Sequence, residues 1–170
     1  AIKDQKSFDT RNWKAQTLKP NVELEVEWLD IDNVESRIDD LRHRGFELGA
    51  ARFARGEGMW MGDGEVFFAC TNGGPNQFGQ VFRYKLSEHE GTVTENQQPG
   101  KLELFVESKD KSVLHMCDNL TIAPNGHIFL CEDNGEVNRI HFIDTAGQIS
   151  LFAINQSSSS EFAGVVFSPS

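Results

Sequence analysis

From Gly45 onward the chain consists of short apolar runs separated by turn sequences, and this alternation limits the possible folds more than any other feature. The runs are AARFARGEGMWM, EVFFACT, QVFRYKL, KLELFVES, NLTIA, HIFLCE, NRIHFI, ISLFAI and EFAGVVF. Segments such as PNG (124–126), DNGE (133–136) and TAG (145–147) lie between them. Gly, Asn and Asp favour tight turns. Many short strands at this spacing predict an all-β sandwich, barrel or propeller.

The runs also recur in a fixed order, which narrows the choice. GMWM, EVFFACT, QVFRYKL and KLELFVES form one set, and NLTIA, HIFLCE, NRIHFI and ISLFAI form a second. GVVFSP opens a third set at the end of the sequence. Four-strand units of this size are typical of propeller blades, although the spacing between the openings is unequal. The order therefore favours part of a β-propeller.

The region before these runs has a different character. Residues 1–21 are polar and unpatterned, and we expect a polar N-terminal segment there. VELEVEWLDI (22–31) alternates apolar and acidic residues, which predicts a half-exposed strand. We expect residues 22–170 to form a partial propeller of about half the blades, truncated at both ends.

One short helix is predicted near residues 33–44. The apolar residues at helical spacing in this stretch are Val34, Ile38 and Leu41. Asp32 and Asn33 precede the stretch as possible caps, and Gly45 follows it as a stop signal.

Composition indicates a folded protein in which acidic side chains outnumber basic ones. The formal net charge is −10, yet 13 residues are Phe, which is too apolar for a disordered acidic segment. A nucleic-acid surface needs clustered Lys and Arg, so we expect no nucleic-acid partner. No apolar run reaches the ~20 residues of a membrane span. Cys70, Cys117 and Cys131 include no CxxC pair and are expected to be free, buried residues.

Each predicted opening strand begins beside a carboxylate. Glu57 precedes Gly58, Asp118 precedes Asn119, and Glu161 lies three residues before Gly164. Because first strands line the channel of a propeller, these carboxylates would converge near its axis. Like charges at close range repel unless a cation neutralises them.

Three further residues extend this candidate cation site. Glu132 and Asp133 end a strand of the second set, and Asn119 offers an amide oxygen. Calcium accepts carboxylate, amide and carbonyl oxygens in loose geometry. The same sequences are also ordinary turn chemistry, since Asp-Asn and Asp-Asn-Gly favour turns and hairpins.

Several separated blocks resemble the PhoX family of calcium-dependent alkaline phosphatases. These blocks, which cover about residues 50–170 in the family's order, are RFARGEGMW, VFFACTNGG, GQVFRY, CDNLTIAPNGHIFLCED and EFAGVVFSP. The resemblance implies a secreted or periplasmic phosphomonoesterase on a six-bladed propeller, with calcium and iron ions in its channel. A cysteine iron ligand of the family is expected outside this sequence, and Cys70 is not assigned that role.

The resemblance also implies roles for individual residues. In the Arg-x-Glu-Gly motif, Arg55 would bind the substrate phosphate and Glu57 the metals. The remaining segments that match family ligand motifs are Asp118-Asn119, Glu132-Asp133 and Glu161 to Gly164. From the residues alone, a salt bridge between Arg55 and a neighbouring carboxylate is the competing interpretation.

Other functions and consequences stay open at this point. A calcium-dependent lactonase or esterase would use a similar carboxylate and amide site, and a non-catalytic propeller would use calcium only for stability. A phosphate ester is the substrate that the resemblance implies. An incomplete propeller exposes an unpaired strand edge. We therefore expect this fragment alone to be inactive and to self-associate.

Overall fold

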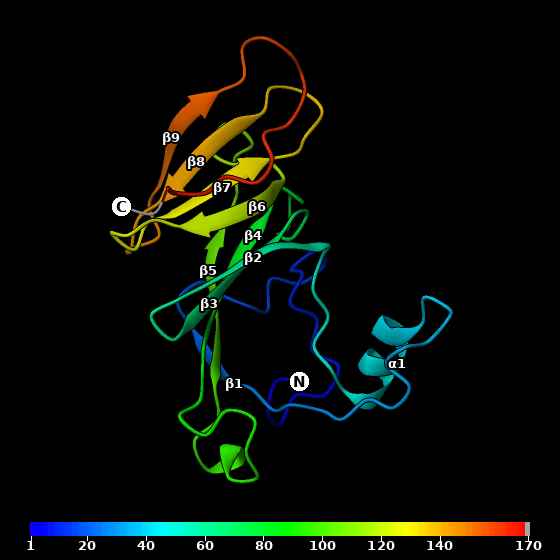
Figure 1. Cartoon of the computed structure of the whole chain (residues 1–170). Helices are drawn as coiled ribbons and strands as arrows, with labels where there is room; N and C mark the ends of the chain where they lie inside the picture. Colours follow the sequence, from blue (N-terminus) through cyan, green and yellow to red (C-terminus); the bar gives the residue numbers. More distant parts are fainter. Residues whose placement is uncertain (169–170) are drawn as a thin grey trace.

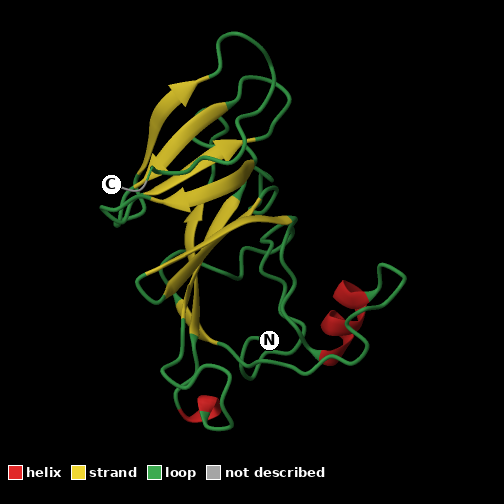
Figure 2. Cartoon of the chain, in the orientation of Figure 1, coloured by secondary structure: helices red, strands yellow, loops and turns green. Residues whose placement is uncertain are grey.

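The computed structural model describes residues 1–168 and consists mostly of β-strands in two antiparallel sheets (Figures 1 and 2). The first sheet has five strands in the order β1-β5-β4-β3-β2, and the second has four in the order β6-β7-β8-β9. The all-β prediction is therefore confirmed. The described residues form no closed ring of sheets, so the propeller stays a prediction.

The first sheet is built mainly from four consecutive strands, each antiparallel to the next. Its strands are β2 (Gly56–Gly62), β3 (Glu65–Cys70), β4 (Gln80–Lys85), β5 (Lys101–Glu107) and the short β1 (Glu23–Glu25), which pairs with β5. A 3-10 turn, η1 (Glu95–Gln97), interrupts the connection between β4 and β5. The four consecutive strands match the first predicted set.

The second sheet repeats this consecutive antiparallel arrangement. Its strands are β6 (Cys117–Ile122), β7 (Ile128–Glu132), β8 (Arg139–Ile143) and β9 (Ile149–Ile154). They match the second predicted set. The turns between these strands use Gly126, Gly135 and Gly147, all with positive φ.

Apolar side chains cover both faces of the first sheet, because alternate residues of a strand point to opposite sides. In β4, Val81 belongs to a core shared with the second sheet, while the next residue, Phe82, belongs to a core on the other face. The N-terminal segment covers that other face and contributes Ile2 and Leu18, which are both buried. The first sheet is thus packed on both sides.

The helix lies further along the chain than predicted. α1 spans Leu41–Leu48 and ends at Gly49, whose φ of 115° is in the left-handed region. Gly45, the predicted stop, is buried inside the helix. Gly49 is the better terminator because its left-handed conformation closes the last turn onto backbone carbonyls.

The predicted capping residues lie outside the helix for a specific reason. The guanidinium of Arg44 donates to the carbonyl oxygens of Asp32 at 2.7 Å and Asn33 at 2.9 Å. These bonds hold residues 32 and 33 against the side of the helix as a loop, and Asp40 takes the capping position instead.

Two predicted strands are shortened or missing. Of the predicted strand 22–31, only Glu23–Glu25 forms a strand, and Val26 then makes an isolated antiparallel bridge with Ile2. EFAGVVF forms no strand in the part that the structure describes. Gly164 has a φ of 69°, which breaks the extended conformation in the middle of this run.

Candidate metal and phosphate site

The inner strands of the two sheets, β2 and β6, touch backbone to backbone. A Cβ atom added to Gly58 would lie 2.5 Å from the carbonyl oxygen of Asp118 and 2.6 Å from the amide nitrogen of Leu120. Only glycine permits this approach. The glycine after Glu57 thus brings the start of β2 against the start of β6.

Both inner strands begin in the same unusual way. Arg55, before β2, has a φ of 45°, and Met116, before β6, has a φ of 57°. The Arg55 carbonyl accepts from the amide of Thr71 at 3.0 Å, and the Met116 carbonyl accepts from the amide of Asp133 at 3.0 Å. Left-handed non-glycine residues are costly and concentrate at functional sites.

A β-bulge follows each of these residues. The pairing of β2 with β3 shifts between Gly56 and Met59, and the pairing of β6 with β7 shifts between Cys117 and Leu120. Glu57 and Asp118 lie at equivalent places within the two bulges. Bulges re-aim side chains at strand ends and are frequent beside active sites. The internal repeat predicted from the sequence therefore includes the local geometry of these two carboxylates.

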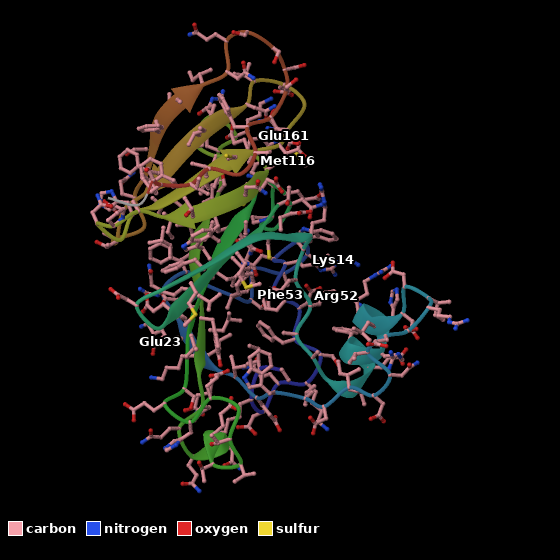
Figure 3. The ribbon with its side chains drawn as sticks, viewed as in Figure 1. Lys14, Glu23, Arg52, Phe53, Met116 and Glu161 are labelled. Carbon is pink, nitrogen blue, oxygen red and sulfur yellow. The ribbon has the colours of Figure 1, made fainter. Side chains whose placement is uncertain are left out.

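Asn119 attaches the segment that carries Glu161 to β6. Its Oδ1 accepts from the amide of Gly164 at 2.7 Å, and its Nδ2 donates to Oδ2 of Asp118 at 3.1 Å. One amide side chain thus orients Asp118 and anchors the chain next to Glu161. Figure 3 labels Glu161 and Met116 at the end of the second sheet where β6 begins.

Four carboxylates share one electrostatic environment at this end. The pKa of Glu161 is raised, chiefly by the charge of Asp133, then by partial desolvation and by the charges of Asp118 and Glu57. Glu57, Asp133 and Glu161 are exposed and Asp118 is half-buried. We call these four residues the carboxylate rim.

Arg55 precedes Glu57, a member of the rim, by two residues. Its side chain is exposed, and within residues 1–168 no carboxylate forms an ion pair with its guanidinium. The salt bridge that competed with the phosphate-binding interpretation is therefore not present in the described chain.

Glu132 differs from the other predicted ligands because it is fully buried. Its Oε1 accepts from the His115 amide at 2.7 Å and contacts Nε2 of His141 at 3.0 Å. Its Oε2 accepts from Arg139 at 3.2 Å and from Asn134 at 3.3 Å. These contacts fix the turn that leads into Asp118.

The buried partners of Glu132 carry no recognisable signal in the sequence. Arg139 and His141 lie in β8, and nothing in NRIHFI distinguishes them from an ordinary strand. Met116 was also missed, although a signal existed. It precedes Cys117-Asp118 as Arg55 precedes Gly56-Glu57.

The rim suits calcium in its chemistry, since it offers only oxygen ligands in a field of like charges. Among the described residues, however, no three His, Cys, Asp or Glu side chains are gathered closely enough to form a metal cluster. Burial raises the pKa of Cys70 and of Cys117 to about 12, which is typical of buried, unreactive thiols.

The model of a family described as "Alkaline phosphatase PhoX" matches residues 4–170. The chain belongs to the PhoX alkaline phosphatase family. No curated protein and no solved structure matches it.

PhoX membership places the sequence motifs in the context of a phosphatase. The family match includes both inner strands, Arg55 and every residue of the carboxylate rim. In addition, no helix within residues 1–168 has the length and apolar character needed to cross a membrane.

Proposed function

We propose that this PhoX-family chain takes part in phosphate monoester hydrolysis, with Arg55 binding the phosphate and the carboxylate rim holding calcium. The proposal rests on the exposed guanidinium of Arg55, which forms no ion pair within residues 1–168 and lies two residues before Glu57 in the sequence, and on the rim charges that raise the pKa of Glu161. A cationic group beside uncompensated carboxylates suits a site that receives both a phosphate and a metal.

In this proposal, one residue binds the phosphate and four others bind the metal. Arg55 binds two phosphate oxygens, because a planar guanidinium matches them and keeps its charge at any physiological pH. Glu57, Asp118, Asp133 and Glu161 hold calcium, which supplies charge neutralisation at the phosphoryl oxygens.

Two of the predicted ligands act as positioning residues. Asn119 orients Asp118 and anchors the Glu161 segment through its bond to the Gly164 amide. Buried Glu132 orders the turn before Asp118 through the His115 amide.

The proposal also includes the complete propeller to which the two sheets would belong. The two sheets would be consecutive blades of a six-bladed propeller, secreted or periplasmic. Iron, if bound, would be held by residues outside this chain. Hydrolysis would require the remaining blades, so the chain alone would be inactive.

The test is hydrolysis of an aryl phosphate by the complete protein with calcium present. Arg55→Lys keeps the positive charge but loses the paired donors, and we expect kcat/KM to fall by about 10²-fold. Arg37→Lys is the matched control, because Arg37 is exposed in a distant loop. An Arg55→Lys variant with unchanged kcat/KM would overturn the role of Arg55.

The same protein is also assayed with an aryl ester and a lactone. Hydrolysis of these substrates without hydrolysis of the phosphate would replace the phosphatase by an esterase or lactonase. Calcium binding without any hydrolysis would indicate a non-catalytic propeller.

A further inference from the structure

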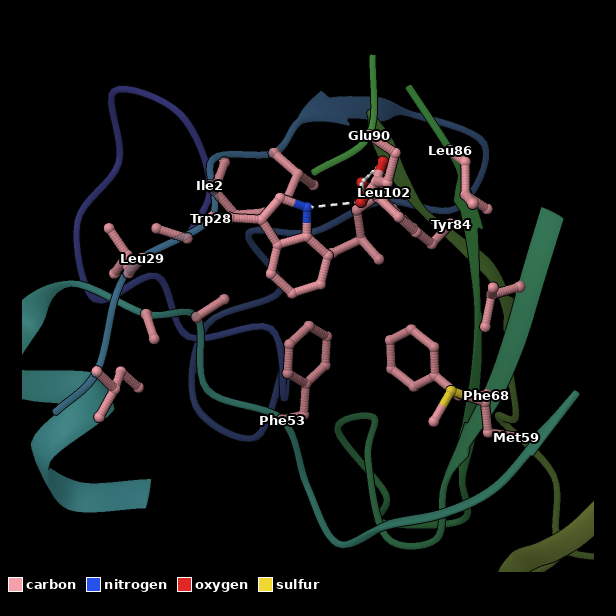
Figure 4. Close-up of a pocket in the computed structure, with 16 residues that line it drawn as sticks. Ile2, Trp28, Leu29, Phe53, Met59, Phe68, Tyr84, Leu86, Glu90 and Leu102 are labelled. Atoms are coloured by element: carbon pink, nitrogen blue, oxygen red, sulfur yellow. Dashed lines mark hydrogen bonds between the residues drawn. The ribbon is translucent and has the colours of Figure 1, made fainter. Parts of the chain in front are cut away.

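A large apolar cavity lies on the face of the first sheet that is turned away from the second sheet. Its volume is about 530 Å³ (Figure 4). β2 to β5 contribute one wall, and the other is formed by residues 1–2, 26–31 and 50–53. None of the rim residues lines it, so it is distinct from the proposed phosphatase site.

Aromatic rings form much of the cavity's lining. Phe53 packs edge to face on Phe68 with ring centroids 5.3 Å apart, and Trp28 packs edge to face on Tyr84 at 6.0 Å. Figure 4 shows the rings of Trp28, Phe53 and Phe68 around the open space. Trp28 is 62% exposed, so solvent reaches this wall.

A single carboxylate, that of Glu90, lies among these rings. It accepts from Nε1 of Trp28 at 2.7 Å, from the Tyr84 hydroxyl at 2.8 Å and from the Ser87 amide at 2.9 Å. All three donors are neutral. Glu90 forms no ion pair with any residue in the described part of the chain.

No side chain that lines the cavity within residues 1–168 supplies a positive charge to balance Glu90. The described residues that line the cavity include no Lys, Arg or His side chain. Ala1 also lines the cavity, and its backbone nitrogen donates to the carbonyl of Glu27. Desolvation is the largest cause of the raised pKa of Tyr84, followed by its hydrogen bond to Glu90 and the negative charges of Glu90 and Glu95.

We propose that this cavity binds an organic cation, such as an alkyl or quaternary ammonium group. The faces of aromatic rings attract cations, and the attraction is strongest at Trp and where water is partly excluded. Because neutral donors hold the Glu90 carboxylate, no ion pair has to be broken before it binds a cation. A bare metal ion fits poorly, because a hard cation needs several oxygen ligands and the cavity offers one carboxylate.

A pair of matched probes tests the proposal on the intact chain. Choline carries the charge, and its neutral carbon isostere, dimethylbutanol, has nearly the same shape. We follow each titration by the indole N–H NMR resonance of Trp28 and expect choline to bind about 10-fold more tightly than the isostere. Equal binding of the two probes, or no binding of either, would overturn the proposal.

Two variants separate the charge from the rings. Glu90→Gln keeps a hydrogen-bond acceptor but removes the negative charge, and it should abolish the preference for choline. Trp28→Leu keeps the wall apolar but removes the aromatic ring, and it should weaken the binding of choline more than the binding of the isostere. For Trp28→Leu, binding is measured by calorimetry. Glu88→Gln is the control, because Glu88 is exposed and does not line the cavity. A choline preference that survives Glu90→Gln in a folded variant would contradict the proposal.

Discussion

Glu161 is the residue whose ionisation reports most directly on the carboxylate rim. Its pKa is raised mainly by Asp133. We predict that Asp133→Asn lowers the pKa of Glu161 in the chelator-treated chain, measured from its carboxyl NMR resonance against pH. Glu136→Gln is the control, because Glu136 lies in the same loop but is not a cause of the shift. An unchanged Glu161 pKa in Asp133→Asn would show that the two carboxylates do not interact.

The direction of this shift also fixes a pH dependence. The folded chain keeps the Glu161 proton to a higher pH than the unfolded chain does. Stability therefore falls as the pH rises through the titration of Glu161, and Asp133→Asn should flatten this part of the profile.

At the scale of elements, the contact between β2 and β6 decides whether Glu57 and Asp118 meet. We predict that Gly58→Ala lowers the free energy of unfolding by about 2–3 kcal/mol, because the new Cβ overlaps the β6 backbone. Gly56→Ala is the matched control in the same strand, since a Cβ there has no atom within 4 Å. Urea unfolding of both variants measures the difference, and equal stabilities would contradict the close contact.

The strand order was predictable because it depends on local signals. Period-2 alternation and Gly- or Asn-containing turns locate β2 to β9 without reference to the rest of the fold. The helix position was not predictable in the same way, because Gly45 and Gly49 are equally plausible stops in the sequence. The left-handed backbone of Gly49 decides where the helix ends, and the contacts of Arg44 with residues 32 and 33 keep the predicted capping residues outside it.

In the candidate site, too, features set by local sequence were predictable and features set by tertiary contacts were not. The acids that begin the inner strands were recognisable, since they stand beside repeated openings. The burial of Glu132 was not, because its partners come from β8 and depend on strand register. The cavity around Glu90 was also beyond sequence reasoning, since it joins the N-terminal segment to strands far along the chain.

At the scale of the whole molecule, the second sheet has an uncovered aromatic face. Phe129 contacts Phe152 at 5.1 Å and Phe167 at 5.0 Å, and Phe152 is 63% exposed. The face of the first sheet that is turned away from the second sheet is instead covered by the N-terminal segment, through Ile2 and Leu18. We predict that the isolated chain self-associates through this face, and that Phe152→Lys weakens the association.

Sedimentation at tens of micromolar measures this association. Val93→Lys is the control, because Val93 is 97% exposed in a loop away from the face. A monodisperse monomer for the unmodified chain would contradict the prediction.

Calcium titration by calorimetry tests the central claim, that the rim is a cation site. The chain is treated with chelator and titrated at neutral pH, beside Glu57→Gln and the control Glu47→Gln, whose exposed carboxylate lies in α1. We predict saturable binding in the unmodified chain and the control, and its loss in Glu57→Gln. Absence of saturable binding, or equal binding by all three proteins, would contradict the account.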